Sequence, residues 1–249
     1  MTTTNKSQKT TKIVIIGLFT ALAFVVSAVL PIKISFLTLD FKDAVSTICG
    51  MFFGPVSGLV CALIVPFIEA TYSGTGIYGL IMNVISSVTL VGISSTVYKY
   101  KKTIWGAVIG LATAAVATMG IMTLANILIT PHYLHITMGM DLEIARQTVK
   151  GMLPTTIIPF NVIKSVLNAS IAMLLYKPIS RMLKKIMNAK ITDDKDENEE
   201  NKENKIVIVV DEETKKKNRI RSLIVTVLSS VIVVASLVIV FLVLGGEIV

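Results

Sequence analysis

Four polar residues interrupt long apolar stretches of this sequence: Asn83, Asn126, Asn161 and Lys164. An amide or ammonium group inside an apolar segment is costly, so such residues usually face a protein interior or a binding site. Asn161 and Lys164 are three residues apart and therefore share one face of a helix. The set predicts a site that binds a polar ligand through hydrogen bonds, although any one asparagine could instead join two helices.

Aromatic residues accompany this polar set and could form the walls of a site for a flat heterocycle. They are Phe36, Phe41, Tyr72, Tyr78, Tyr133 and Phe160. Any single one is more typical of an anchor at the membrane surface. We find no phosphate-binding loop and no hydrolase or metalloprotease motif. We therefore expect no catalytic residue, metal site or bound cofactor, and energy for any uphill transport must come from another subunit.

The composition places these residues in a membrane protein. Hydrophobic residues make up 53% of the chain, charged residues 16%, and the mean hydropathy is +0.75. Such values are far from those of soluble domains. Cys49 and Cys61 lie in apolar stretches, where a buried free thiol is the expected state. The lysines and arginines gather at a few helix ends, a pattern that indicates membrane topology rather than nucleic-acid binding.

Apolar runs define the segments that must position the polar residues. A helix needs about 20 residues to cross the hydrocarbon core. Gly54-Pro55 divides one long apolar region into a short helix and a longer one, because a proline after a glycine breaks helices. The predicted helices cover residues 13–30, 44–53, 55–72, 76–98, 104–129, 155–177 and 222–244.

Basic residues orient these helices, since they accumulate on the cytoplasmic side. Lys6, Lys9 and Lys12 place the N-terminus inside, and the break at Gly54-Pro55 then returns the lysines near residue 100 to the cytoplasm. We thus predict an all-α protein of the cell membrane that crosses it several times. A six-helix transmembrane bundle with a short second helix spans residues 1–187. A charged cytoplasmic linker (188–218) and a seventh transmembrane helix (219–249) follow.

In this topology the four polar residues all lie in the outer half of the membrane, where a pocket that opens outward would need them. No acidic residue is expected at the depth of Lys164, so we expect a ligand or backbone carbonyls to satisfy its ammonium group. Pro31 to Asp43 forms an external loop. The seventh helix is expected to be flexibly tethered, and removal of residues 190–249 should leave ligand binding intact.

Three ordered motifs carry a resemblance to a known family. They are Phe36-Leu37-Thr38-Leu39-Asp40-Phe41-Lys42-Asp43 with Gly54-Pro55-x-x-Gly58, then Asn126-x-x-x-Thr130-Pro131-x-Tyr133, then Pro159-Phe160-Asn161-x-x-Lys164. Over about residues 12–186 the sequence resembles the S components of energy-coupling factor (ECF) transporters, and specifically their riboflavin-specific branch.

The resemblance implies a function in vitamin import. The S component captures riboflavin or a related flavin outside and passes it inward with an ECF transmembrane coupling subunit and its ATP-binding subunits. The flavin is substrate and not cofactor, and the loop after the first helix lids the pocket. The coupling subunit docks on small residues of the first helix, here Gly17, Ala21 and Ala23. The binding residues that the resemblance implies are Asn126, Asn161 and Lys164. To these we add, as further candidates, Leu39, Asp40, Asn83, Tyr133 and Phe160.

Two departures from the family pattern leave alternatives open. Relatives often carry a lysine in the third helix and an acidic residue at the start of the fourth, where this chain has Val65-Pro66 and Leu80. An S component for a non-flavin vitamin is therefore a second hypothesis, while a modified flavin remains within the first. The seventh helix and its linker favour a third, a membrane scaffold or assembly protein. A membrane enzyme ranks last, since no acid/base pair shares a common depth.

Overall fold

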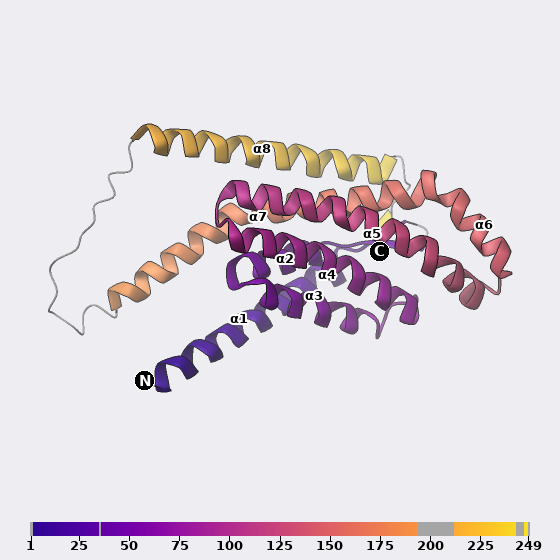
Figure 1. Ribbon diagram of the computed structural model, residues 1–249, viewed down its shortest axis with the longest axis horizontal. Helices are drawn as coiled ribbons and strands as arrows, with labels where there is room; N and C mark the ends of the chain where they lie inside the picture. The colour runs from indigo at the N-terminus through magenta and orange to yellow at the C-terminus, as the bar shows by residue number, and fades with distance from the viewer. Residues whose placement is uncertain (1, 35, 194–211, 243–246, 249) are drawn as a thin grey trace.

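The computed structural model describes residues 2–34, 36–193, 212–242 and 247–248. This part of the chain is a bundle of helices (Figure 1). A short hairpin, β1 (Ile32–Ile34) and β2 (Leu37–Leu39), links the first two helices. The helices are α1 (Thr2–Val29), α2 (Lys42–Phe53), α3 (Pro55–Glu69), α4 (Gly76–Tyr100), α5 (Ile104–Met138), α6 (Leu142–Met152), α7 (Ile158–Asp193) and α8 (Glu212–Leu242), and a π-helical turn, Leu153–Ile157, leads into α7.

The lengths of the helices agree with a membrane bundle. Five apolar helical segments of the described chain are long enough to cross a membrane, and α3 is a shorter apolar helix. The break at Gly54-Pro55 is confirmed. Gly54 has φ of +99°, a value that favours glycine, and Pro55 begins α3, where its missing N–H leaves no helical bond unmade. Residues 42–51 of the short α2 are all buried by the neighbouring helices.

Two glycines allow α2 and α3 to pack closely. A Cβ atom added to Gly58 would lie 2.6 Å from the Cα of Gly50 and 2.8 Å from Cγ1 of Val91 on α4. The nearest atom belongs to the backbone of a packed helix and cannot rotate away. Gly50 in turn faces Ser95, so the contact between α2, α3 and α4 requires residues without side chains. Small residues at helix crossings serve this purpose in membranes.

The segment after residue 129 differs from the prediction. We expected a helix to end at residue 129, but α5 continues through Pro131 to Met138. Proline is tolerated inside membrane helices because neighbouring groups compensate for its missing hydrogen bond. The additional helix α6 was not predicted. Asp141 caps its N-terminus by accepting hydrogen bonds from the backbone N–H groups of Glu143 and Ile144, at 2.8 and 3.4 Å.

The loop after α1 is partly ordered as a small sheet. β1 pairs antiparallel with β2, and the sheet order is β2-β1-β3. The third strand, β3 (Glu247–Ile248), comes from the end of the chain and pairs with Ile32 and Lys33 of β1. Buried Ile32, Ile34 and Leu39 fix the hairpin onto the bundle through contacts with α7.

The C-terminal helix is not loosely tethered, contrary to our expectation. α8 packs along α7 (Figure 1), and its Val240 is fully buried beside Leu167. The charged linker also differs from its predicted bounds, because α7 reaches Asp193 and α8 begins at Glu212. The remaining linker residues, 194–211, lie outside the described residues.

The close α2–α3 contact generates a prediction. Gly58→Ala should destabilise the protein, because its methyl group would press on the backbone of Gly50. Overpacking of this kind costs ~1–3 kcal/mol. Gly120→Ala on α5 is the matched control, since a Cβ atom there meets nothing within 4 Å. Thermal unfolding in detergent should show a lower midpoint for Gly58→Ala alone, and equal midpoints for the two variants would contradict the argument.

Candidate functional site

Helices α4, α5 and α7 and the β1–β2 hairpin surround a cavity of about 90 Å³. Six of the eight residues predicted for the site line it: Asn83, Asn126, Tyr133, Phe160, Asn161 and Lys164. The fold therefore brings these six predicted residues, which lie up to 81 positions apart in the sequence (164 minus 83), onto the surface of one cavity. The other lining residues are Phe36, Leu37, Thr38, Thr75, Tyr78, Gly79, Met82, Ser86, Met122, Ile129 and Thr130.

The α5 wall is one helix face with its own internal hydrogen bonds. Met122, Asn126 and Thr130 are spaced by four residues, so they align along the helix. The side chain of Asn126 is fully buried, donates to the Met122 carbonyl at 2.8 Å and accepts from Thr130 Oγ1 at 3.0 Å. The sequence analysis missed Met122 and quoted Thr130 in a motif without assigning it to the site, although the spacing of both from Asn126 was a usable signal.

The α7 wall carries free hydrogen-bonding capacity. Asn161 is buried, and its Nδ2 has no hydrogen-bond partner among the described residues. One turn further, Lys164 Nζ donates to the Thr38 carbonyl at 3.2 Å and to Asp40 Oδ2 at 2.9 Å. An ammonium group has three N–H donors, so one remains. Asn161 and Lys164 thus offer adjacent donors on the same helix face.

The expectation that no acidic residue reaches Lys164 was wrong. Asp40 lies in the segment after the hairpin, which folds into the bundle instead of staying in an external loop. Asp40 Oδ2 accepts from Lys164 and also from Lys42, at 2.9 and 3.0 Å. Burial alone would raise the pKa of Asp40, but the ammonium groups of Lys164 and Lys42 outweigh it and lower that pKa to about 2.

The charged cluster continues beyond Asp40, and the sequence analysis did not identify this part. Lys42 also pairs with Glu69 at the end of α3, at 2.6 Å. Glu69 accepts a hydrogen bond from Asn83 Nδ2 at 3.3 Å, which connects the cluster to the cavity wall. The signal in the sequence was the position of Glu69, an acidic residue at the end of an apolar helix.

Four of the six aromatic residues that we predicted for the site line the cavity. The ring centroids of Phe36 and Tyr78 each lie 6.3 Å from that of Tyr133. Aromatic pairs at such distances form stable, specific contacts. Phe160 lines the cavity from α7, whereas Phe41 and Tyr72 do not line it.

Two predicted residues lie beside the cavity rather than on its surface. Leu39 is fully buried in the apolar cluster that joins the hairpin to α7. Asp40 is buried behind Lys164 and reaches the cavity only through that side chain. We therefore infer that neither residue contacts a ligand directly. Leu39 packs the hairpin against α7, and Asp40 holds the ammonium group of Lys164.

The predicted docking face on α1 is divided by the fold. Gly17 and Ala21 are exposed and, being four residues apart, share one face of the helix. They border an apolar groove between α1 and α3. Ala23 does not belong to this face. It is fully buried against Val45 of α2 and Val65 of α3.

Comparisons with known proteins agree on one family. The family model of the ECF transporter substrate-specific component matches residues 11–176. The chain is 27% identical to the riboflavin transporter RibU of Staphylococcus aureus (strain TCH60), over 72% of this chain and 95% of that protein. It also resembles the solved structure of the S component of a bacterial ECF transporter. The TM-score is 0.57 at 27% identity, with 71% of this chain and 99% of the other covered.

The match at residues 11–176 contains every residue that lines the cavity, together with the charged cluster behind it. It covers more than half of the chain, and its members are transporter components rather than enzymes. The chain belongs to the family of substrate-specific components of ECF transporters.

Proposed function

We propose that this S component binds riboflavin or a closely related flavin in the cavity between α4, α5 and α7. The observation that carries the proposal is the pair of free donors on α7, the Asn161 Nδ2 atom and the remaining N–H of Lys164. A flavin ring presents carbonyl oxygens and ring nitrogens along one edge, which accept such bonds. Its flat faces suit Phe36, Tyr78 and Tyr133. The similarity to a riboflavin transporter supports the same substrate class.

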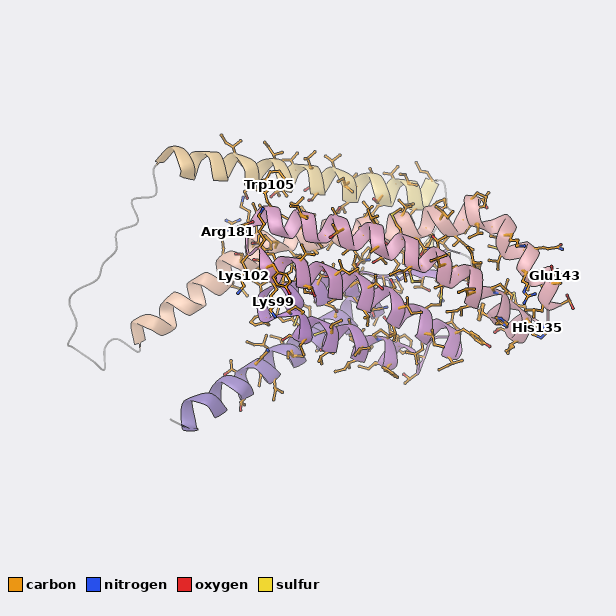
Figure 2. The ribbon with its side chains drawn as sticks, viewed as in Figure 1. Lys99, Lys102, Trp105, His135, Glu143 and Arg181 are labelled. Carbon is orange, nitrogen blue, oxygen red and sulfur yellow. The ribbon has the colours of Figure 1, made fainter. Side chains whose placement is uncertain are left out.

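We further propose that the protein has six crossings plus α8, with a cytoplasmic N-terminus. Figure 2 supports this orientation, because Lys99, Lys102 and Arg181 lie at one end of the bundle and His135 and Glu143 at the other. Basic residues mark the cytoplasmic side. The cavity then lies in the outer half, since its residues lie towards the His135 end of α4 and α5.

The hairpin is proposed as the lid of this site. The cavity of about 90 Å³ is smaller than the ~300–1,000 Å³ of sites that enclose ligands of this size. Phe36, Leu37 and Thr38 of the hairpin form part of its wall. A flavin can therefore enter only if the hairpin moves outward, and contacts such as Lys164 with the Thr38 carbonyl must open.

Transport is proposed to require a separate module, an ECF coupling subunit with ATP-binding subunits, that docks on α1. Gly17 and Ala21 supply a small, exposed face where another helix can approach closely. Ala23 is excluded from the proposed contact because it is buried inside this chain.

The proposed site generates a binding prediction. Asn161→Leu should raise the Kd for riboflavin roughly 5- to 100-fold, corresponding to the ~1–3 kcal/mol cost of an unpaired buried polar group. Lys164→Met should weaken binding as well. Thr113→Val is the control, since Thr113 is exposed and, within the described part of the chain, its hydroxyl bonds to carbonyls of its own helix. Riboflavin fluorescence quenching measures Kd, and unchanged affinity in both site variants would place the ligand elsewhere.

The docking face generates a transport prediction. Ala21→Trp should abolish riboflavin uptake while the purified protein still binds riboflavin, because the indole blocks close approach of a second helix. Val116→Trp adds the same bulk to an exposed position on α5 and should transport normally. Uptake is measured in cells that express the coupling module. Parental uptake by Ala21→Trp would reject this face.

A further inference from the structure

The last described strand of the chain pairs with the hairpin that supplies part of the cavity wall. β3, Glu247–Ile248, forms the outer strand of the sheet whose other edge is β2. Its partners on β1 are Lys33 and Ile32. β2 in turn supplies Leu37 and Thr38 to the cavity. One small sheet therefore connects the C-terminal extension to the proposed lid.

A second contact between the extension and the hairpin is independent of strand pairing. Val240 of α8 is fully buried in the apolar cluster that contains Ile32, Ile34 and Leu39 of the hairpin. Val233 and Leu237 of α8, which share its helix face, pack against the same cluster. Val238, two residues away, is 49% exposed and points from the other side of the helix.

These contacts stabilise the hairpin in the position seen here. A two-stranded hairpin is only marginally stable by itself, and a third strand with an apolar contact makes such a sheet far more stable. Apolar packing against the helix is lost if the hairpin swings outward. The family match ends at residue 176, so neither α8 nor β3 belongs to the part of the chain shared with the family.

We propose that α8 and β3 brace the lid hairpin and set the rate at which the cavity opens. The brace slows both entry and release of the ligand, while the equilibrium affinity changes little, because no described residue of α8 or β3 lines the cavity. The identity of the ligand rests on the proposed function, but the opening of the hairpin can be measured without any ligand.

A labelling experiment without ligand tests the brace directly. Ser86→Cys places a thiol in the cavity wall at a position that is only 4% exposed, while native Cys49 and Cys61 are fully buried. A water-soluble maleimide then reports opening in the full-length chain. Adding Val240→Ala should speed labelling about tenfold, the effect of removing two buried carbon atoms. Val238→Ala is the matched control and should leave the rate unchanged. Equal rates in the two variants would overturn the brace.

Riboflavin exchange tests the link to transport. Stopped-flow quenching should show association and dissociation both about tenfold faster in Val240→Ala than in Val238→Ala, with Kd within about twofold. Faster labelling together with no riboflavin binding by the parent chain would retain the brace and reject the proposed ligand. Unchanged exchange in a variant that labels faster would show that the ligand does not pass the hairpin.

A cross-link tests the opposite direction and does not depend on the stability of Val240→Ala. Lys33→Cys with Glu247→Cys places cysteines at partner positions of antiparallel strands, a spacing that a disulfide can bridge. Oxidation should slow riboflavin release at least tenfold, and a reducing agent should restore it. Parental release from the oxidised protein would overturn the proposal, as would failure of the pair to cross-link.

Discussion

The carboxylate of Asp40 is the group that holds the hairpin segment, α2 and α7 together behind the cavity. It accepts hydrogen bonds from the ammonium groups of both Lys42 and Lys164. Burying a charge away from water costs several kcal/mol, and only close pairing offsets that cost. The chain therefore has to bring the segment after the hairpin, the start of α2 and the first two turns of α7 together. Asn168 strengthens the junction by donating to the Asp40 carbonyl and accepting from the Ala44 N–H.

The sequence predicted most of the helices and most of the cavity because both follow from local patterns. Apolar runs and Gly54-Pro55 located the helices, and the depth of Asn83, Asn126 and Asn161 located the wall. Asp40 could not be placed in the same way. Its contact with Lys164 joins positions 124 residues apart, and no spacing rule connects a loop to a helix at that separation. The role of each residue in binding remains a prediction.

Failures elsewhere have equally specific causes. Pro131 normally indicates the end of a helix, but the membrane environment and neighbouring helices sustain α5 beyond it. The helix α6 was detectable in principle, because Asp141 is a good N-cap and Ala145 and Val149 repeat at four residues. The packing of α8 was not detectable. Its apolar residues surround the helix and predict a membrane span, but they do not indicate which face packs against the protein. Only the fold shows that Val240 contacts the hairpin.

The charge balance of the site bears on the class of ligand. Lys164 is the charged residue of the described cavity lining, and its ammonium is already paired with Asp40. An anionic ligand would compete with that carboxylate for Lys164 and would bring a second negative charge close to it, and burial of a charge without its own partner is expensive. An uncharged heterocycle can accept from Asn161 and from the remaining N–H of Lys164 without separating the ion pair.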